Sequence, residues 1–427
     1  MRRRDRKQLL VLCALTLGAG LGGVRAGSAQ MLLVPMDESQ DNHLRAYGLV
    51  YWTISTGESA EWLLNYRAGS FLVPSQQRVV EQAALMGVTV RSLTGAELAG
   101  LRAEIEASNM EAVPLEKAPR IAVYTPPNSS PWDDAVTMAL EYADIPYERI
   151  WDPAVLNGEL TEYEWLHLHH EDFTGQYSKF YLTYTKSDWL REEVARNQQV
   201  ANEFGYPNVP ELKKAVARKI REYVEGGGFL FAMCTATETL ELALAAENVD
   251  IAAAFADGSP PAPNATSAMD WERSMAFRDA TIVLDPSLSA FSEIDGHQVN
   301  TPWRKPLGSF TLFDFSAKID PVATMLTQSH ERVLGDYYGL TTSFSRRVVK
   351  HGVIELATDS NLGTIKYLHG GYGKGSFTFL GGHDPEDPQH LIGDPETDLE
   401  LRRNSPGYRL ILNNVLYPAA KKKALKT

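Results

Sequence analysis

Short apolar runs alternate with amphipathic stretches along most of this chain. After residue 119 the apolar runs predict strands, and a spacing of three to four residues between apolar positions predicts helices. The strands are expected at residues 120–124, 147–151, 163–171, 229–233, 310–315, 352–357 and 376–380, and the helices at 131–142, 211–225 and 408–416. This alternation predicts an α/β fold with a doubly wound, mostly parallel sheet.

A smaller α/β region precedes this domain. Its strands are expected at residues 31–35, 71–74 and 88–92, and its helices at 42–54, 77–86 and 96–107. A proline-bearing break at 109–119 separates the two parts, so we expect an N-terminal α/β region at 30–115 and the main domain at 116–427. Polar or proline-rich stretches near 172–210 and 252–306 interrupt the main domain and are interpreted as insertions.

The first residues predict the compartment. A basic head at residues 2–7 precedes an apolar core at 9–21, and small residues follow at 27–29, which together are typical of a cleaved signal peptide covering residues 1–29. No other segment approaches the roughly 20 apolar residues of a helical membrane span. We therefore expect an exported bacterial protein, periplasmic or at the cell surface, with no transmembrane segment in the mature chain. An uncleaved N-terminal anchor is the alternative.

Charge and cysteine content narrow the functions further. Removing residues 1–29 removes six basic residues and one acidic residue, which takes the net charge from −13 to −18. Such a chain repels nucleic acids and anionic membranes, so neither is an expected partner. Of the two cysteines, Cys13 lies in the signal segment and Cys234 remains. A lone thiol in an oxidising compartment is expected to be either buried or used chemically.

The sequence around Cys234 is the strongest candidate for a reactive site. Glycines at 226–228 precede the apolar run 229–233, and a helix is expected to begin directly after Cys234. Ala232 and Ala236 flank the cysteine with small side chains, as a sharp strand-to-helix turn requires. The helix N-terminus favours a thiolate, and the amide of Thr235 is placed to stabilise an oxyanion. The alternative is a structural cysteine that fills a buried position.

A second strand-end motif offers a base. The apolar run 376–380 ends in Gly381-Gly382, and His383 follows with Asp384 and Glu386 close behind. A cysteine nucleophile needs a base to accept its proton and a group that orients the base. His383 is the candidate base, and Glu386 or Asp384 is the candidate orienting group. A polar loop without a chemical role is the alternative.

These two motifs resemble those of the class I glutamine amidotransferase-like superfamily, including its trehalose-utilisation-protein-like branch. In that family a glycine-bounded strand leads to the nucleophilic cysteine, and a later strand ends in a glycine-histidine or His-Pro-Glu motif. The resemblance covers about residues 119–417. It implies a flavodoxin-like, amidotransferase-like sheet, with Cys234 as nucleophile, His383 as base and Glu386 as orienting residue.

Two departures from the family pattern argue against glutamine hydrolysis. Alanines and Met233 surround the cysteine where the glutaminases carry glycines. The run 163–171 ends in His169-His170-Glu171, where the family has a glycine-rich oxyanion loop. We therefore expect His169, His170 and Glu171 to bind substrate rather than to reproduce that loop.

The N-terminal region resembles exported bacterial proteins that are commonly labelled asparagine synthetase B. The stretches at residues 36–48 and 62–67 carry this resemblance. An asparagine synthetase needs a cysteine at its processed N-terminus and a Ser-Gly-Gly-x-Asp-Ser loop for pyrophosphate, and this sequence has neither. The label therefore has no support from the residues.

A metal-binding alternative comes from the end of the run 163–171. Strand alternation places His167, His169 and Glu171 on one face and His170 on the other. Two histidines and a carboxylate in this pattern suit zinc or another divalent ion, and His383, Asp387 or His390 would complete the site if the loops converge. A polar strand end, with its histidines paired to neighbouring carboxylates, is the competing interpretation, and the preferred expectation is that no cofactor is needed.

Taken together, the sequence predicts an exported, cysteine-dependent hydrolase-like enzyme that acts on a small polar or glycan-derived substrate. Rings that could stack on a sugar follow Glu171, although such residues more often anchor an insertion; they are Phe173, Tyr177, Phe180, Tyr181, Tyr184 and Trp189. Two alternatives stay open. One is a non-catalytic ligand-binding or surface-assembly protein that keeps the fold, and the other is a metal-dependent enzyme.

Overall fold

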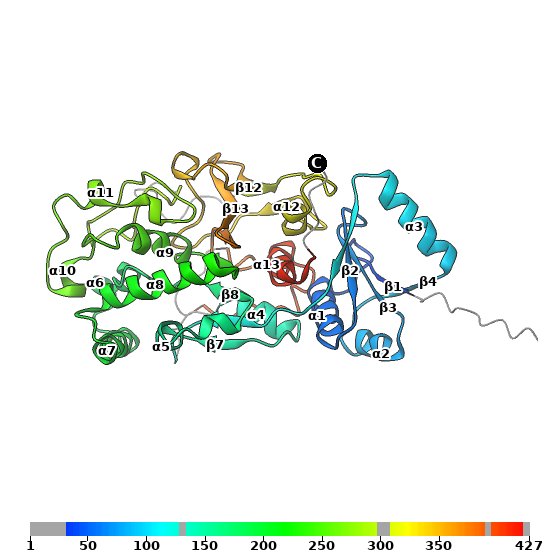
Figure 1. Ribbon diagram of the computed structural model, residues 1–427, viewed down its shortest axis with the longest axis horizontal. Helices are drawn as coiled ribbons and strands as arrows, with labels where there is room; N and C mark the ends of the chain where they lie inside the picture. The colour runs from blue at the N-terminus through cyan, green and yellow to red at the C-terminus, as the bar shows by residue number, and fades with distance from the viewer. Residues whose placement is uncertain (1–30, 128–133, 297–307, 389–393, 422–427) are drawn as a thin grey trace, which may run out of the picture.

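The computed structural model describes residues 31–127, 134–296, 308–388 and 394–421. The predicted signal peptide and His390 lie outside the described residues. The described chain forms an elongated molecule with a five-stranded sheet towards one end and a nine-stranded sheet in the larger remainder (Figure 1). The fold is therefore a mixed α/β arrangement built on two sheets.

The five-stranded sheet is antiparallel throughout and has the order β4-β1-β3-β2-β5. Its strands are β1 (Met31–Val34), β2 (Ala60–Leu64), β3 (Ser70–Pro74), β4 (Arg91–Leu93) and β5 (Glu111–Leu115). Its helices are α1 (His43–Ser55), α2 (Gln77–Leu85) and α3 (Gly95–Ala107). Strand β5 occupies part of the predicted break at 109–119. It contains Pro114, which is tolerated because β5 is the last strand of this sheet and an edge strand can lack an amide donor at one position.

The nine-stranded sheet has the order β11-β10-β12-β13-β14-β9-β8-β6-β7. Its strands are β6 (Ile121–Tyr124), β7 (Glu148–Ile150), β8 (Trp165–Leu168), β9 (Phe229–Met233), β10 (Ser309–Leu312), β11 (Val333–Gly335), β12 (Ile354–Asp359), β13 (Ile365–Tyr372) and β14 (Gly375–Leu380). The pairs from β14 to β7 are parallel, and those from β11 to β14 are antiparallel. The prediction of a mostly parallel sheet is therefore correct for one half only. In the other half, β12-β13 and β13-β14 pair as hairpins, and β10 pairs with both β11 and β12.

Helices cover both faces of the parallel half. The α-helices of the nine-stranded unit are α4 (Ala135–Tyr142), α5 (Asp152–Leu156), α6 (Tyr181–Tyr184), α7 (Asp188–Glu203), α8 (Val209–Gly226), α9 (Ala236–Ala245), α10 (Ala254–Asp257), α11 (Ala265–Ala268), α12 (Pro321–Leu326) and α13 (Pro406–Leu416). Short 3₁₀ helices lie at η1 (Glu159–Glu162), η2 (Tyr177–Lys179), η3 (Trp271–Arg273), η4 (Arg346–Val348) and η5 (Tyr417–Ala419).

Alternation along the strands divides the core in two. Phe229, Phe231 and Met233 of β9 join an apolar cluster with α4 and α13, whereas Leu230 and Ala232 join a second cluster with α8 and α9. Successive side chains of a strand point to opposite faces, so a strand buried on both faces is apolar throughout. The first cluster continues through α1 into the N-terminal unit.

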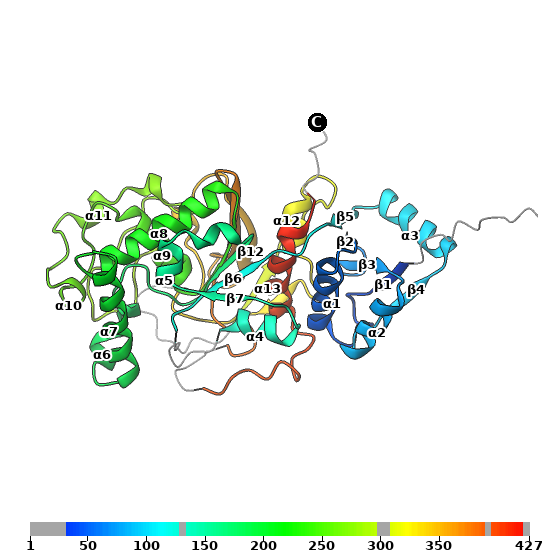
Figure 2. The same cartoon turned by 60° about the horizontal axis from the view of Figure 1, so that its bottom comes forward.

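Helix α13 joins the two units. It lies beside α1 and α4 in both views (Figures 1 and 2), and its asparagines and arginine face inward. The guanidinium of Arg409 is fully buried and donates to the carbonyl of Met36 (2.7 Å), the hydroxyl of Tyr47 (3.1 Å) and the carbonyl of Ala68. Arg409 therefore fastens the N-terminal unit to the nine-stranded unit.

Within the described residues, no helix combines the length and the apolar character that crossing a membrane requires.

Candidate active site

Four parallel strands bring the candidate residues to one edge of the sheet. Strands β8, β9 and β14 are followed at once by His169, Cys234 and the Gly381-Gly382-His383 motif, and β6 leads to Asp134 at the start of α4. The carboxyl ends of parallel strands meet at the same edge, which is where open α/β sheets bind ligands. The two sequence motifs therefore lie at neighbouring strand ends.

Cys234 occupies the predicted strand-to-helix turn. Its backbone φ is 48°, in the left-handed region, between the last residue of β9 and the first turn of α9. A non-glycine residue in this region costs of order 1–3 kcal/mol and persists only where the surrounding structure enforces it. The hydroxyl of Thr237 donates to the carbonyl of Cys234 (2.6 Å), and the amide of Ala236 donates to the carbonyl of His169 (3.0 Å). These bonds hold the turn and tie it to β8.

The sulfur of Cys234 is enclosed by backbone. The side chain is buried, and a Cβ atom on Gly339 would lie 2.8 Å from Sγ. Burial raises the pKa of the Cys234 thiol, while the Thr235 hydroxyl (Oγ1 3.6 Å from Sγ) and the amides of Leu340, Thr235 and Thr341 act in the opposite direction. The resting thiol is therefore neutral, and amides surround it that would stabilise negative charge.

Residues 336–343 form the segment that closes over the thiol, here called the covering segment. Its carbonyls accept hydrogen bonds from the motif that follows β14, since Gly382 donates to the carbonyl of Thr341 (2.9 Å) and His383 donates to that of Tyr338 (2.8 Å). A Cβ atom on Gly381 would collide with the carbonyl of Thr342, and Gly382 has a φ of 92°. The two glycines after β14 therefore permit the close approach of the covering segment.

Two buried charged residues, Lys366 and Glu238, hold the covering segment in place. The ammonium of Lys366 on β13 donates to the carbonyls of Tyr337 (2.6 Å) and Thr342 (3.0 Å) and pairs with Asp336 (2.7 Å). Glu238 in the first turn of α9 accepts from the hydroxyls of Thr341 (2.8 Å) and Ser292 (2.5 Å). Burial raises the pKa of Glu238 to about 7.

His169, His170 and His383, here called the histidine cluster, lie together at the ends of β8 and β14. The rings of His169 and His383 have centroids 4.3 Å apart at 66°, and those of His170 and His383 are stacked at 5.8 Å and 13°. One nitrogen from each ring lies within 4.8 Å of the other two. The structure thus brings two predicted substrate-binding histidines against the predicted base.

Asp134 and His167 lie behind His169. Oδ1 of Asp134 is 3.2 Å from Nδ1 of His169 and 3.5 Å from Nε2 of His167, and the two histidine nitrogens are 3.3 Å apart. Burial would raise the pKa of Asp134, but the two histidines hold it well below its usual range. Burial lowers the pKa of His169. The nearby Asp134 outweighs this effect, so the pKa of His169 is raised.

The predicted acidic residues have other partners. Glu386 faces Arg402 (3.4 Å), and Asp384 accepts from the hydroxyls of Tyr408 (2.9 Å) and Thr397 (2.8 Å). The carboxylate of Glu171 accepts the amide of His169 (2.8 Å) and belongs to neither group of metal-ligating atoms found among the described residues. Asp134, rather than one of these carboxylates, orients a histidine of the cluster.

Cys234 and His383 both border Gly339. The space that a side chain on Gly339 would fill lies against both Sγ of Cys234 and the amide nitrogen of His383 (3.2 Å). The ring of His383 instead packs on His169 and His170.

Two parts of the site were not identified from the sequence. Asp134 was expected inside a helix at 131–142, whereas it caps α4 by accepting the amides of Val136 (2.7 Å) and Thr137 (3.2 Å). An acid at a helix start after a predicted strand was the available signal. Nothing in the local sequence of the covering segment indicates that it folds over Cys234.

The aromatic residues that follow Glu171 pack mainly on one another. Phe173 is in the core, and Tyr177 forms a small apolar cluster with Leu190 and Val209 against Tyr181, Tyr184 and Trp189. Tyr181 also stacks on Phe255 at 4.6 Å. This packing matches the anchoring interpretation of these rings.

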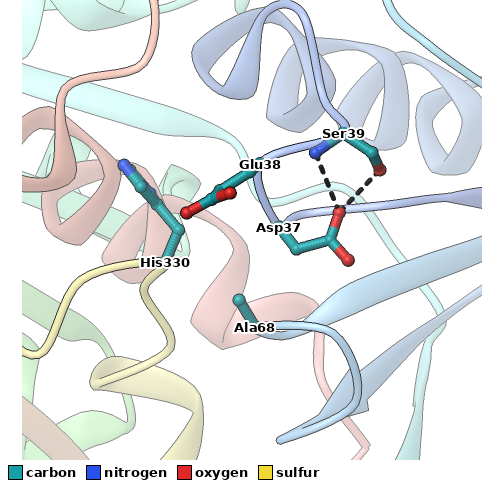
Figure 3. Close-up of a pocket in the computed structure, with 5 residues that line it drawn as sticks. All are labelled: Asp37, Glu38, Ser39, Ala68 and His330. Atoms are coloured by element: carbon teal, nitrogen blue, oxygen red, sulfur yellow. Dashed lines mark hydrogen bonds between the residues drawn. The ribbon is translucent and has the colours of Figure 1, made fainter.

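A separate pocket lies at the seam between the two units (Figure 3). It has a volume of about 370 Å³, and its lining residues are Asp37, Glu38, Ser39, Ala68 and His330. Burial raises the pKa of Asp37, but hydrogen bonds from Arg67 and Ser39 outweigh it and lower that pKa to about 2. The pocket is therefore acidic, and none of its lining residues belongs to the strand-end site.

Comparison with known proteins does not assign the chain to a family. No protein-family profile matches the chain, and no curated protein matches it by sequence. Two cytoplasmic proteins of Salmonella typhimurium match its structure at a TM-score of 0.33 and 11% identity, over 71% of this chain and 100% of theirs. A protein of Thermoplasma acidophilum, described as a proposed component of GMP synthase, matches at 0.34 and 7%, over 70% of this chain and 94% of its own. Likenesses at these scores establish neither a shared family nor a shared function.

Proposed function

We propose that the protein is a hydrolase-like enzyme of amidotransferase-like fold that uses Cys234 as its nucleophile. One observation carries this function: Cys234 holds a left-handed backbone at the junction of β9 and α9, with three amides facing its sulfur. Strained turns that expose a nucleophile to backbone amides are a recurring solution for acyl transfer. The expected substrate is a small polar or glycan-derived molecule with a carbonyl group.

The chemistry follows from a thiol that is neutral at rest. As sulfur bonds to the substrate carbonyl carbon, its proton passes to a base supplied by the histidine cluster, and the carbonyl electron pair moves onto oxygen. The amides of Thr235, Leu340 and Thr341 are placed to stabilise that negative charge. The leaving group then departs with the proton, and water hydrolyses the thioester. Substrate entry requires the covering segment to move, because Gly339 packs on the sulfur.

The strand order and the N-terminal sequence support the wider proposal. Numbered in chain order, the five parallel strands β7-β6-β8-β9-β14 run 2-1-3-4-5, the order of flavodoxin-like doubly wound sheets. The basic head and apolar core of residues 1–29 support export.

Labelling of the thiol tests this function. The native protein is treated with a small haloacetamide, and its mass is followed over time beside a urea-unfolded reference. Native labelling should occur, should vanish in Cys234→Ala, and should slow at least about tenfold in His383→Ala with no change in the unfolded rate. The matched control is His369→Ala, which removes a buried histidine that pairs with Thr378 on the neighbouring strand.

A native protein that resists labelling while the unfolded chain reacts fully would contradict the nucleophile assignment. That result would identify Cys234 as a structural residue and favour the non-catalytic binding protein. The burial of its sulfur is the observation that favours this second candidate.

A further inference from the structure

In the part of the chain that the structure describes, one buried nitrogen of the histidine cluster has no hydrogen-bond partner. His169 is 1% exposed, and among the described residues its Nε2 has no hydrogen-bond partner. A buried polar atom without a partner costs on the order of 1–3 kcal/mol, so such an atom calls for an explanation. One ring nitrogen each of His169, His170 and His383 lies within 4.8 Å of the other two.

The surroundings of His169 determine which of its nitrogens carries the proton in the neutral ring. Nδ1 of His167 faces the carbonyl of Phe231 (3.0 Å) and must donate to it, which leaves Nε2 of His167 as an acceptor. Nδ1 of His169 then faces two acceptors, this Nε2 (3.3 Å) and Oδ1 of Asp134 (3.2 Å), so Nδ1 carries the proton. Nε2 of His169 therefore carries the lone pair that is left for a ligand.

We propose that His169, His170 and His383 bind a divalent transition-metal ion, with zinc as the best fit, and that Asp134 orients His169 as an outer-shell carboxylate. Three imidazoles suit zinc and other borderline metals. A carboxylate behind a ligating histidine is the usual device that fixes its tautomer and ring direction. His169 and His383 belong to the metal site considered from the sequence, whereas His170 takes the place of His167 and Glu171.

The spacing allows this coordination with small side-chain movements. Zinc–nitrogen bonds of about 2.0–2.1 Å place tetrahedral ligands roughly 3.3 Å apart, somewhat closer than the 4.8 Å limit within which the three nitrogens lie. Three protein ligands leave a fourth position for water or for a substrate oxygen. Cys234 is not a ligand, because its sulfur faces Thr235, Gly339, Leu340 and Thr341.

Metal binding at this cluster does not depend on thiol chemistry at Cys234. A histidine nitrogen that binds the metal has no lone pair left for the thiol proton, so metal loading would slow the thiol reaction. The two proposals can therefore fail separately, and the experiment below uses binding rather than activity as its readout.

The test is titration of the full-length, chelator-treated protein with Zn²⁺ by calorimetry, and with Co²⁺ by visible absorption. We expect one equivalent to bind, a tetrahedral Co²⁺ spectrum without a thiolate charge-transfer band, and a higher melting temperature with Zn²⁺. His170→Ala and His383→Ala should each weaken binding by more than about 100-fold, and Asp134→Asn by about 10- to 100-fold. His170 is only partly buried, so its variant keeps the test open if His383→Ala does not fold.

Two control variants make the result specific. His351→Ala removes an exposed histidine outside the cluster and should bind as the wild type does. Cys234→Ala should also keep one equivalent, whereas loss of the metal there would overturn the ligand set. No stoichiometric binding by the wild type, or unchanged binding by His170→Ala and His383→Ala, would equally overturn the site. Failed thiol labelling with intact metal binding would count against the nucleophile alone.

Discussion

Gly339 packs its main chain directly against the sulfur of Cys234, because a Cβ atom there would lie 2.8 Å from Sγ. The covering segment and the strand-to-helix turn are thus fitted to each other at a single small residue. This contact joins the ends of β9 and β14, since the same space borders the amide nitrogen of His383.

The first prediction concerns this contact. Gly339→Ala should lower the free energy of unfolding by about 1–3 kcal/mol, because the added methyl group overpacks the space beside Sγ. In a Cys234→Ala background the same change should cost less, since the sulfur is gone. Urea denaturation of the four proteins measures the coupling. Gly335→Ala is the matched control, because a Cβ there meets nothing within 4 Å. Equal costs in both backgrounds would contradict the contact.

The backbone of Cys234 allows a second prediction. Glycine adopts a φ of 48° without strain, so Cys234→Gly should be more stable than Cys234→Ala by about 1 kcal/mol. At Ala232, inside β9, the same exchange of alanine for glycine should be destabilising. Equilibrium unfolding in urea checks both, and an advantage for alanine at position 234 would show that the turn is unstrained.

A third prediction follows from the raised pKa of Glu238. Because folding raises it from 4.5 to about 7, the folded state holds a proton that the unfolded state has lost. The contribution of Glu238 to the free energy of unfolding is fully present below pH 4.5. As the pH rises towards 7 this contribution is lost, and the free energy of unfolding falls by an amount on the order of 3 kcal/mol. Glu238→Gln should therefore lose less stability than the wild type between pH 5 and 7.5. Parallel profiles would show that Glu238 does not titrate in this range, and Glu222→Gln, at an exposed site, should leave the profile unchanged.

Arg409 provides a fourth prediction. Its fully buried guanidinium donates hydrogen bonds to oxygens of Met36, Tyr47 and Ala68. Arg409→Leu removes these donors and leaves several of the oxygens without a hydrogen bond. We expect the free energy of unfolding to fall by at least about 3 kcal/mol, measured by urea denaturation. The exposed neighbour Arg403→Leu should change it by less than about 0.5 kcal/mol. A small effect at Arg409 would mean that the two units are held together mainly by apolar packing.

Strands with uniform apolar character could be predicted from sequence. The run at 229–233 is the strand β9, because it is buried on both faces and ends at the alanine-flanked cysteine. Strand β13 was missed, since Lys366, His369 and two glycines interrupt its apolar pattern. Lys366 is buried there because it holds the covering segment, a long-range requirement that no local pattern records.

The candidate site, too, could be predicted from the sequence only where local patterns fix its residues. Cys234 and the histidines stand at strand ends, where the sequence motifs placed them, because local turn chemistry fixes those positions. The partners of these residues are Asp134, Gly339 and Thr341, which arrive from distant parts of the chain. Tertiary packing selects such partners, and single-sequence patterns carry no record of it.

The most direct test of a shared reaction centre is the rate at which a haloacetamide labels Cys234 in metal-free protein and in protein loaded with one equivalent of Zn²⁺. If the histidine cluster and the thiol act together, loading should change the rate several-fold in the wild type and leave it unchanged in His170→Ala. The four samples are the wild type and His170→Ala, each without metal and with Zn²⁺. Identical labelling rates in all four would contradict a common centre at the ends of β8, β9 and β14.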